Sequence, residues 1–250
     1  MSAHLVQESD SKSFQRRESL NESGILVVDK PEGLTSMDVI RVLRKVCNAR
    51  KIGHGGTLDP FATGVLPILI NKATGLSAKV MEGIKEYEGS LVLGVAYDTQ
   101  DMTGTPLYDP KPVPLDVTME RLNELAKAFE GNIEQRPPMY SAVKKNGRPL
   151  YDYARAGETV EVETRKVFVE RFRLTEKIDE RTFKFYVRSA KGVYVRTLVH
   201  DLGEKLGIGA VVKSLTRTQA GRYHIDEAVQ LSTLKFASDV RAHLKPLNAI

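Results

Sequence analysis

Short apolar runs that alternate with polar, glycine-rich breaks dominate this chain and predict its secondary structure. An apolar run bounded by turn-forming residues is typical of a buried strand, whereas apolar residues three and four positions apart indicate one face of a helix. We therefore expect strands at 24–29, 65–70, 87–96 and 209–221, with further strands between 160 and 190. We expect helices after a cap at Thr35 or Ser36, around 75–84, at 118–130 and at 195–206, and a short helical tail that ends at Ile250.

Two of these helices are expected to be amphipathic. The hydroxyl of Thr35 or Ser36 is suited to cap the first of them, because it accepts a hydrogen bond from an amide of the first turn. Cys47 follows the same helical pattern and is interpreted as a small core residue. The residues expected to line the two apolar faces are Val39, Val42, Leu43 and Val46 in the first helix, and Leu122, Leu125, Ala126 and Phe129 in the second.

Four segments between the elements are polar or rich in turn formers. Segment 53–64 holds four glycines, and segment 97–104 is crowded with hydroxyl and carboxylate groups. Two adjacent prolines prevent segment 135–142 from being helical. Segment 143–158 starts with basic residues and contains two tyrosines, so we interpret it as an excursion that lies on a ligand.

Charge is distributed unevenly along the chain. Residues 126–250 hold 23 Lys and Arg against 15 Asp and Glu, a net charge of +8, whereas residues 1–125 hold 14 against 17, a net charge of −3. A basic half favours a polyanionic partner, first of all a nucleic acid.

The remaining composition indicates a globular protein of the cytoplasm. Of the 250 residues 41% are hydrophobic and 28% are charged, which is ordinary for a chain with one large core. No apolar run has the length of a membrane span, and the N-terminus lacks the apolar region of a secretory signal. A single cysteine excludes an internal disulfide and fits a reducing compartment. We expect a flexible tail at 1–22 and one domain at 23–250.

Asp59 is the first candidate for chemistry. It precedes Pro60 within segment 53–64, and the proline biases its backbone toward an extended conformation. The segment is therefore predicted to be a rigid turn that presents one carboxylate, with His54 five residues earlier. Such a turn suits a catalytic carboxylate, but a structural carboxylate that accepts backbone N–H bonds fits the same residues.

A second candidate cluster lies at 189–198. Gly192 allows a tight turn, and Tyr194 and Arg196 lie on one face if the backbone there is extended. An aromatic ring beside a guanidinium suits an unstacked base and a phosphate or carboxylate. A surface strand with an ordinary tyrosine and arginine is the alternative, and Tyr87, between two glutamates, is ambiguous by itself.

Other site chemistries find less support. His54, Asp59, Asp98 and Asp101 are possible metal ligands, but the five histidines are scattered and no two of them have ligand spacing. The glycines at 53–56 lack the lysine and hydroxyl residue of a P-loop, and no Gly-x-Ser-x-Gly occurs. We therefore expect no metal, no nucleotide hydrolysis and no serine nucleophile.

In their order and spacing the motifs resemble those of the TruB family of bacterial tRNA pseudouridine-55 synthases. The resemblance runs from Gly24 to about Tyr223. The motifs that carry it are GILVVDKPEGLTS at 24–36, GHGGTLDPFATG at 53–64, KEY at 85–87, RPPMYSA at 136–142, KGVYVRTL at 191–198 and LTR at 215–217.

The resemblance implies an α+β pseudouridine-synthase fold, with a mixed, mainly antiparallel sheet flanked by helices and loops, and an RNA-binding insertion at about 136–158. It implies an isomerase that converts the T-loop uridine at position 55 of tRNA. The enzyme would bind the T-stem-loop as a monomer, without cofactor, membrane or obligatory protein partner. About 27 residues follow Tyr223, so we expect the PUA domain common in the family to be absent and tRNA affinity to be lower.

The resemblance also implies roles for individual residues. Asp59 corresponds to the family's nucleophile, and Arg196 to the arginine that pairs with it. His54 corresponds to the histidine that stacks in the opened T-loop while the target base is flipped out. The residues that correspond to the walls of the base pocket are Tyr87, Tyr194 and Leu215.

Three other functions stay open at this point. A guide-dependent pseudouridine synthase has the Asp59 motif but works with partner proteins. A non-catalytic RNA-binding or chaperone module would not need Asp59. A glycosidase would need a second carboxylate about 5–10 Å from the first, for which Asp98 and Asp101 are candidates.

Overall fold

The computed structural model describes residues 19–249, so residues 1–18 of the predicted tail and Ile250 lie outside the described residues. The last residues of the predicted tail are packed against the fold. Leu20 is buried, and its amide donates to the carbonyl of Cys47 (2.8 Å), because an apolar side chain within the polar N-terminal segment completes the core beside the first helix.

The predicted α+β class is confirmed. Within residues 19–249, eleven strands form one mixed sheet in the order β12-β1-β3-β10-β4-β9-β8-β5, with β2, β11 and β13 paired along it. Most neighbours are antiparallel, whereas β12 and β1, and β3 and β10, are parallel. The strands are β1 (Gly24–Lys30), β2 (Ile52–His54), β3 (Thr63–Ile70), β4 (Lys85–Leu93), β5 (Gly131–Gln135), β8 (Arg165–Lys177), β9 (Thr182–Ser189), β10 (Ala210–Ala220), β11 (Tyr223–His224), β12 (Val229–Gln230) and β13 (Lys245–Pro246), and a separate hairpin is formed by β6 (Lys144–Lys145) and β7 (Arg148–Pro149).

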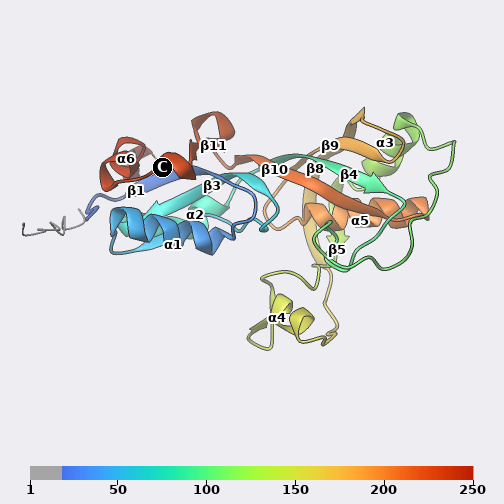
Figure 1. Cartoon of the computed structure of the whole chain (residues 1–250), viewed down its shortest axis with the longest axis horizontal. Coiled ribbons are helices and arrows are strands. Elements are labelled where there is room, and N and C mark those ends of the chain that lie inside the picture. The colour runs from blue at the N-terminus through green and yellow to red at the C-terminus, as the bar shows by residue number, and fades with distance from the viewer. Residues whose placement is uncertain (1–18, 250) are drawn as a thin grey trace, which may run out of the picture.

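Helices pack against this sheet, and the molecule is elongated along it (Figure 1). The α-helices of the described chain are α1 (Ser36–Cys47), α2 (Ser77–Met81), α3 (Met119–Lys127), α4 (Leu150–Arg155), α5 (Val195–Leu206) and α6 (Ala237–Ala242), and 3₁₀ turns occur at η1 (Asn71–Leu76), η2 (Ile225–Glu227), η3 (Leu231–Thr233) and η4 (Leu247–Ala249).

The predicted elements agree with the structure except at their boundaries. The helix predicted at 195–206 is α5, with the same first and last residues. The helix predicted at 75–84 is a 3₁₀ turn followed by α2, which ends at Met81. The strand predicted at 87–96 is β4, which is shifted toward the N-terminus and ends at Leu93.

The buried face of α1 differs in one residue from the prediction. Val39 and Leu43 are buried as expected, but Val42 is 36% exposed. Ile40 takes its place, and Cys47 is buried as predicted. Successive helical residues are about 100° apart, so the core contacts the 39–40–43–47 stripe, and Val42 lies beyond its edge. Thr35 caps the helix in a capping box with Asp38.

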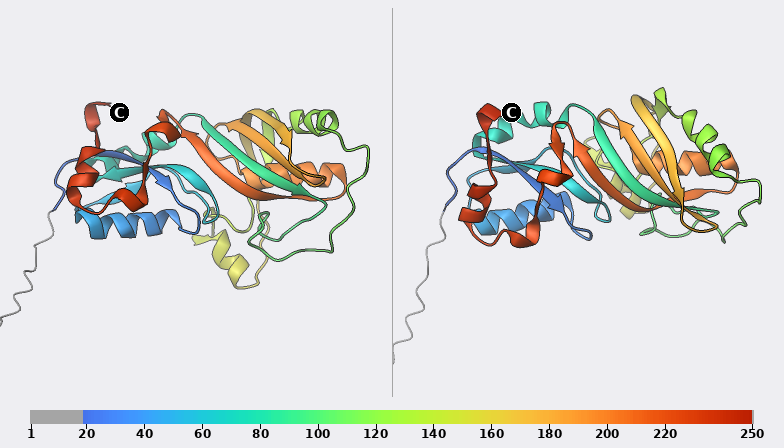
Figure 2. Two further views of the ribbon diagram at one scale, coloured as in Figure 1. Left: turned by 45° about the horizontal axis from the view of Figure 1, so that its top comes forward. Right: turned by 90° about the horizontal axis from the view of Figure 1, so that it is seen from above.

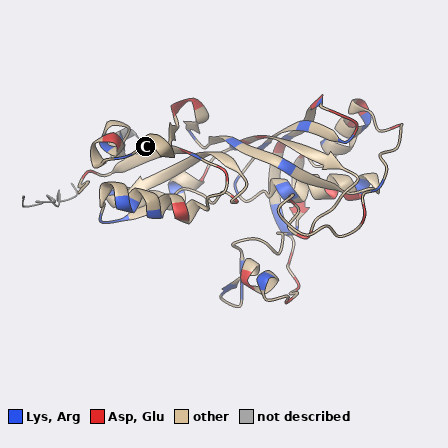
Figure 3. Cartoon of the chain, viewed as in Figure 1, with Lys and Arg blue, Asp and Glu red and all other residues tan. Residues whose placement is uncertain are grey.

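The candidate site lies where the two halves of the sheet meet. β10 pairs with β4 along most of its length, but with β3 only at Thr216–Thr63 and Arg217–Gly64. The segment with β6, β7 and α4 projects away from the sheet layer (Figures 1 and 2). Lysine and arginine lie on α1, on this projecting segment and along the sheet (Figure 3).

Candidate active site

A bidentate ion pair joins Asp59 to Arg196. Asp59 lies in the loop between β2 and β3, and Arg196 is the second residue of α5. Nε of Arg196 donates to Oδ2 of Asp59 (2.8 Å), and Nη2 donates to Oδ1 (3.2 Å). The arginine side chain is 3% exposed, whereas the carboxylate is 33% exposed. The two hydrogen bonds therefore fix the orientation of the carboxylate, while part of the carboxylate stays open to solvent.

The same guanidinium ties Asp59 to two further loops. Its Nη1 donates to the carbonyl of Thr99, and its Nη2 also donates to the carbonyl of Tyr140 (2.8 Å). The carboxylate of Asp101, itself buried, lies 3.7 Å from Nη1. Arg196 thus connects three segments: the glycine-rich loop (53–64), the polar loop (97–104) and the start of the projecting segment at Tyr140.

The backbone at Arg196 is not extended, which was the condition for Tyr194 and Arg196 to lie on one face of a strand. Tyr194 is extended (φ −98°, ψ 110°) and caps α5, but Arg196 is already helical. The two side chains therefore do not alternate along a strand. The guanidinium of Arg196 reaches the carboxylate of Asp59 from this helical turn.

Arg217 holds the glycine-rich loop from the sheet side. Its side chain, 2% exposed, donates to three carbonyls of the loop and of β3. These belong to Val65 (2.8 Å), Thr57 (3.3 Å) and Gly56 (3.2 Å). A guanidinium with its five N–H groups is suited to hold several carbonyls at once, so Arg217 fixes the loop on both sides of Asp59.

Two buried polar side chains hold the loop next to Asp59. The hydroxyl of Ser36 accepts from the amide of Leu58 (2.9 Å). The ammonium of Lys30, in a fully buried side chain, donates to the carbonyl of Pro60 (3.2 Å) and to two carbonyls of the following turn. Both residues that flank Asp59 are therefore anchored through their backbone.

Gly64 permits the close approach of β3 to β10. Its φ is +97°, and a Cβ added there would lie 2.3 Å from the carbonyl oxygen of Arg217. We expect Gly64→Ala to lower the free energy of unfolding by about 3 kcal/mol, because it adds backbone strain and a clash with main chain. Gly33→Ala is the matched control: its φ is +84° with open space around it, so only about 1 kcal/mol is expected. Equal losses in urea unfolding would contradict the close-approach argument.

Burial lowers the pKa of Lys30 to about 8, although Asp59 and Glu32 oppose this shift. Between pH 8 and the ordinary value of 10.5, the unfolded chain binds more protons at this site than the fold does. The free energy of unfolding therefore rises with pH across this window. We expect wild type to gain about 3 kcal/mol relative to Lys30→Met between pH 8 and 10.5 in urea titrations. Lys85, whose pKa burial also lowers to about 8, is common to both proteins and cancels. A pH-independent difference would refute this assignment.

A cavity of about 760 Å³ opens above the ion pair. Asp59, His54 and Arg196 line it, together with parts of α1, the polar loop and the projecting segment. Burial, and next the charge of Arg217, lower the pKa of His54, so its imidazole is neutral at pH 7. Its Nδ1 is buried and has no hydrogen-bond partner among the described residues.

Three of the predicted site residues do not line this cavity. Tyr87 (9% exposed) and Leu215 (6% exposed) are part of the hydrophobic core. Tyr194 is held by Gln135, whose side-chain amide exchanges hydrogen bonds with its backbone (2.8 and 3.0 Å), while Arg165 lies over its ring at 4.9 Å. The structure thus brings Asp59, His54 and Arg196 to one cavity and places the apolar and aromatic candidates outside it.

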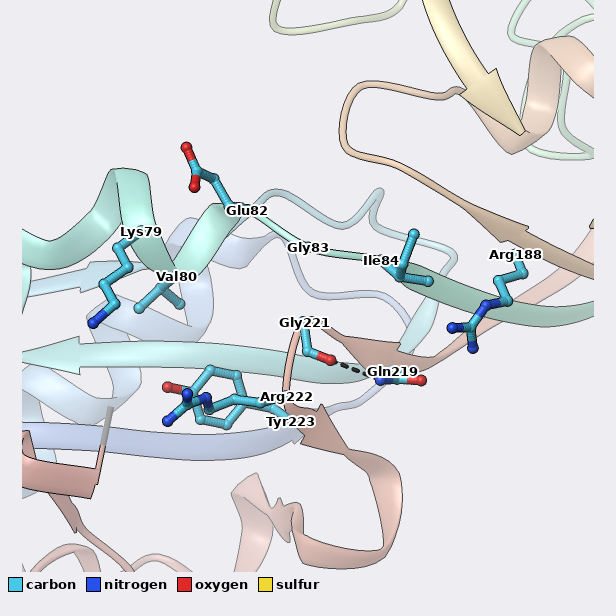
Figure 4. Close-up of a pocket in the computed structure, with 10 residues that line it drawn as sticks. All are labelled: Lys79, Val80, Glu82, Gly83, Ile84, Arg188, Gln219, Gly221, Arg222 and Tyr223. Carbon is cyan, nitrogen blue, oxygen red and sulfur yellow. Dashed lines mark hydrogen bonds between the residues drawn. The ribbon is translucent and has the colours of Figure 1, made fainter. Parts of the chain in front are cut away.

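A second cavity, of about 400 Å³, lies between α2, β9 and the turn after β10 (Figure 4). Its Arg188 pairs with Glu86 and with Glu170 (2.8 Å). Neighbouring strand residues point to opposite faces, so Glu86 lies on the other side of the sheet from Tyr87. This cavity lacks every residue of the Asp59 cluster.

The geometry also weighs on two alternative chemistries. Within residues 19–249, no group of three or more His, Cys, Asp and Glu side chains is arranged to hold a metal ion. Of the two candidates for the second carboxylate of a glycosidase, Asp101 is 4% exposed and bound by Arg196 and by the hydroxyls of Thr99 and Thr103. Asp98 is exposed and lines the cavity. None of the helices in the described part is long and apolar enough to cross a membrane.

Comparisons with known proteins identify the family of this chain. Residues 44–195 match the TruB family pseudouridylate synthase N-terminal domain, and residues 196–250 match the tRNA pseudouridylate synthase B C-terminal domain. The chain is 41% identical over 235 residues to tRNA pseudouridine synthase B of Levilactobacillus brevis, covering 90% of this chain and 77% of the relative. It is 46% identical over 213 residues to the protein of that name from Stutzerimonas stutzeri, covering 85% and 68%.

A solved structure supports the fold. A chain of a Cbf5-Nop10-Gar1 complex superposes with a TM-score of 0.69 at 30% identity, and the match covers 90% of this chain and 60% of that chain. The α+β pseudouridine-synthase fold expected from the sequence is therefore confirmed. With family matches across most of its length and relatives above 40% identity, this chain belongs to the TruB family of pseudouridylate synthases.

Proposed function

We propose that this chain is a tRNA pseudouridine synthase that isomerises the T-loop uridine at position 55. The observation that carries the proposal is the half-open carboxylate of Asp59, held by the buried Arg196 at the floor of a large cavity. The TruB relatives are named as tRNA pseudouridine synthases, which supplies the substrate class.

The reaction breaks the bond between N1 of uracil and C1′ of ribose and forms a bond between C5 and C1′. The proton on C5 leaves, and N1 ends protonated, so the change is an isomerisation that consumes neither redox equivalents nor phosphate energy. A carboxylate is a competent covalent partner for such a step. In our proposal Asp59 takes this role, and Arg196 keeps it oriented.

The substrate base must leave the helical stack to reach Asp59. We propose that neutral His54 stacks in the opened loop, because its ring lies at the cavity wall and carries no charge at pH 7. Tyr87, Leu215 and Tyr194 are proposed to contact the base after it enters. None of the three is among the residues that line the cavity of the free protein.

We propose the T-stem-loop of tRNA as the ligand and residues 136–158 as the insertion that closes over it. The protein is proposed to act as a monomer in the cytoplasm without an obligatory protein partner. Identities of 41–46% to relatives named tRNA pseudouridine synthase B, against 30% to the Cbf5 complex, favour this over a guide-dependent enzyme.

The proposal is tested with a tRNA transcript that carries tritium at C5 of its uridines. Because C5 of the isomerised uridine loses its hydrogen when it bonds to C1′, the protein is expected to release one tritium per tRNA into water. A transcript with cytidine at position 55 is expected to release none. Release that is absent from the first transcript, or equal in both, would overturn the proposal.

A further inference from the structure

Two arginines lie at the mouth of the cavity, beside the exposed Asp98, whereas two carboxylates lie at its floor. The carboxylates of Asp59 and Asp101 lie at the floor, bound to the buried Arg196. Arg41 and Arg155 line the same cavity but are exposed, and the Arg41 side chain is 67% exposed. A phosphate is repelled by the acidic floor and attracted by the arginines, so an RNA strand fits with its base inward and its phosphates at the rim.

The rim is built from two helices with the same local pattern. On α1, Met37 is followed four residues later by Arg41, and on α4, Tyr151 is followed four residues later by Arg155. Residues four apart lie on the same helix face, and all four residues line the cavity. Each wall therefore offers one apolar or aromatic group beside one guanidinium.

The α1 side of this rim carries neither Asp59 nor any of its hydrogen-bond partners. Met37 is 48% exposed and lines the cavity one helical turn before Arg41. The nearby Asp38 is engaged: it accepts from the amide (3.0 Å) and hydroxyl (2.6 Å) of Thr35 in the capping box, and from one nitrogen of Arg41. The remaining N–H groups of Arg41 stay available for an anion.

We propose that Met37 and Arg41 form an RNA-contacting wall on α1, opposite the insertion, in which Arg41 binds a backbone phosphate and Met37 packs on an adjacent base or sugar. This inference rests on the proposed function, because it takes the same RNA as occupant. An acidic protein segment fits Arg41 but gives Met37 and the neighbouring base-sized cavity no role.

The test is the salt dependence of binding to a T-stem-loop RNA hairpin. Arg41→Gln is expected to raise Kd about three- to tenfold and to make the slope of log Kd against log salt smaller by about 0.7–0.9, the value for one lost phosphate contact. Arg41→Lys is expected to keep the slope, since it keeps the charge. Met37→Ala is expected to raise Kd about threefold without changing the slope.

Arg44→Gln is the matched control, because this substitution removes the same charge from the same helix. Arg44 is exposed but does not line the cavity. It is expected to leave the slope unchanged. Equal slopes for Arg41→Gln and Arg44→Gln would overturn the proposal, as would wild-type affinity of Met37→Ala. If wild type releases tritium from tRNA and the slopes are equal, only this inference fails; if wild type neither releases tritium nor binds the hairpin, the proposed function fails as well.

Discussion

Asp59→Asn is expected to lower kcat at least about a thousandfold, while Kd for the T-stem-loop RNA changes less than about threefold. Asparagine keeps the shape of the side chain but is a poor covalent partner. The fold should tolerate the change, because Arg196 keeps the carbonyls of Thr99 and Tyr140 and the carboxylate of Asp101 as partners. Single-turnover kinetics and RNA binding by fluorescence anisotropy measure the two quantities.

The Asp59→Asn result separates catalysis from binding. A non-catalytic RNA-binding module predicts that neither quantity moves. A purely structural Asp59 predicts a loss of stability that accompanies the loss of activity, which thermal unfolding of the variant detects. Only the catalytic assignment predicts lost turnover with retained stability and affinity.

Arg196→Met is expected to lower the free energy of unfolding by about 3–5 kcal/mol and kcat at least about a hundredfold. The substitution leaves the carboxylates of Asp59 and Asp101 without their shared cation and three loop segments without their common donor. Urea unfolding and single-turnover kinetics check the two effects.

Two comparisons make the Arg196 result interpretable. Arg196→Lys keeps the charge but loses the bidentate geometry, so it should recover part of the stability and little of kcat. Arg121→Met removes an exposed arginine paired with Asp116 and should change stability little. A loss from Arg196→Met no larger than that from Arg121→Met would contradict the view that Arg196 organises the site.

The regular elements around the site were predictable because their patterns are local. The apolar run of β3, the amphipathic spacing of α5 and the glycine after it are visible within a few residues. The wrong assignment of Val42 has a physical reason: a helix pattern shows which residues are apolar, but only tertiary packing decides which edge of the stripe faces the core.

The supports of the glycine-rich loop at 53–64 were much less predictable. Arg217 acts through backbone carbonyls of three residues, and carbonyls have no sequence signal. The contacts of Arg196 with Thr99 and Tyr140 are of the same kind. The one available signal was the location of Lys30 and Arg217 within the motifs of the family, together with the apolar run just before Lys30, where an unpaired charge is unfavourable.

The most direct measurement of the central claim maps where the protein acts on tRNA. An unmodified tRNA transcript is incubated with wild type, treated with carbodiimide and copied by primer extension, which stops at pseudouridine. The account predicts a single new stop at position 55 in the T-loop and none after incubation with Asp59→Asn. No stop with wild type, a stop only at other uridines, or an undiminished stop with Asp59→Asn would contradict it.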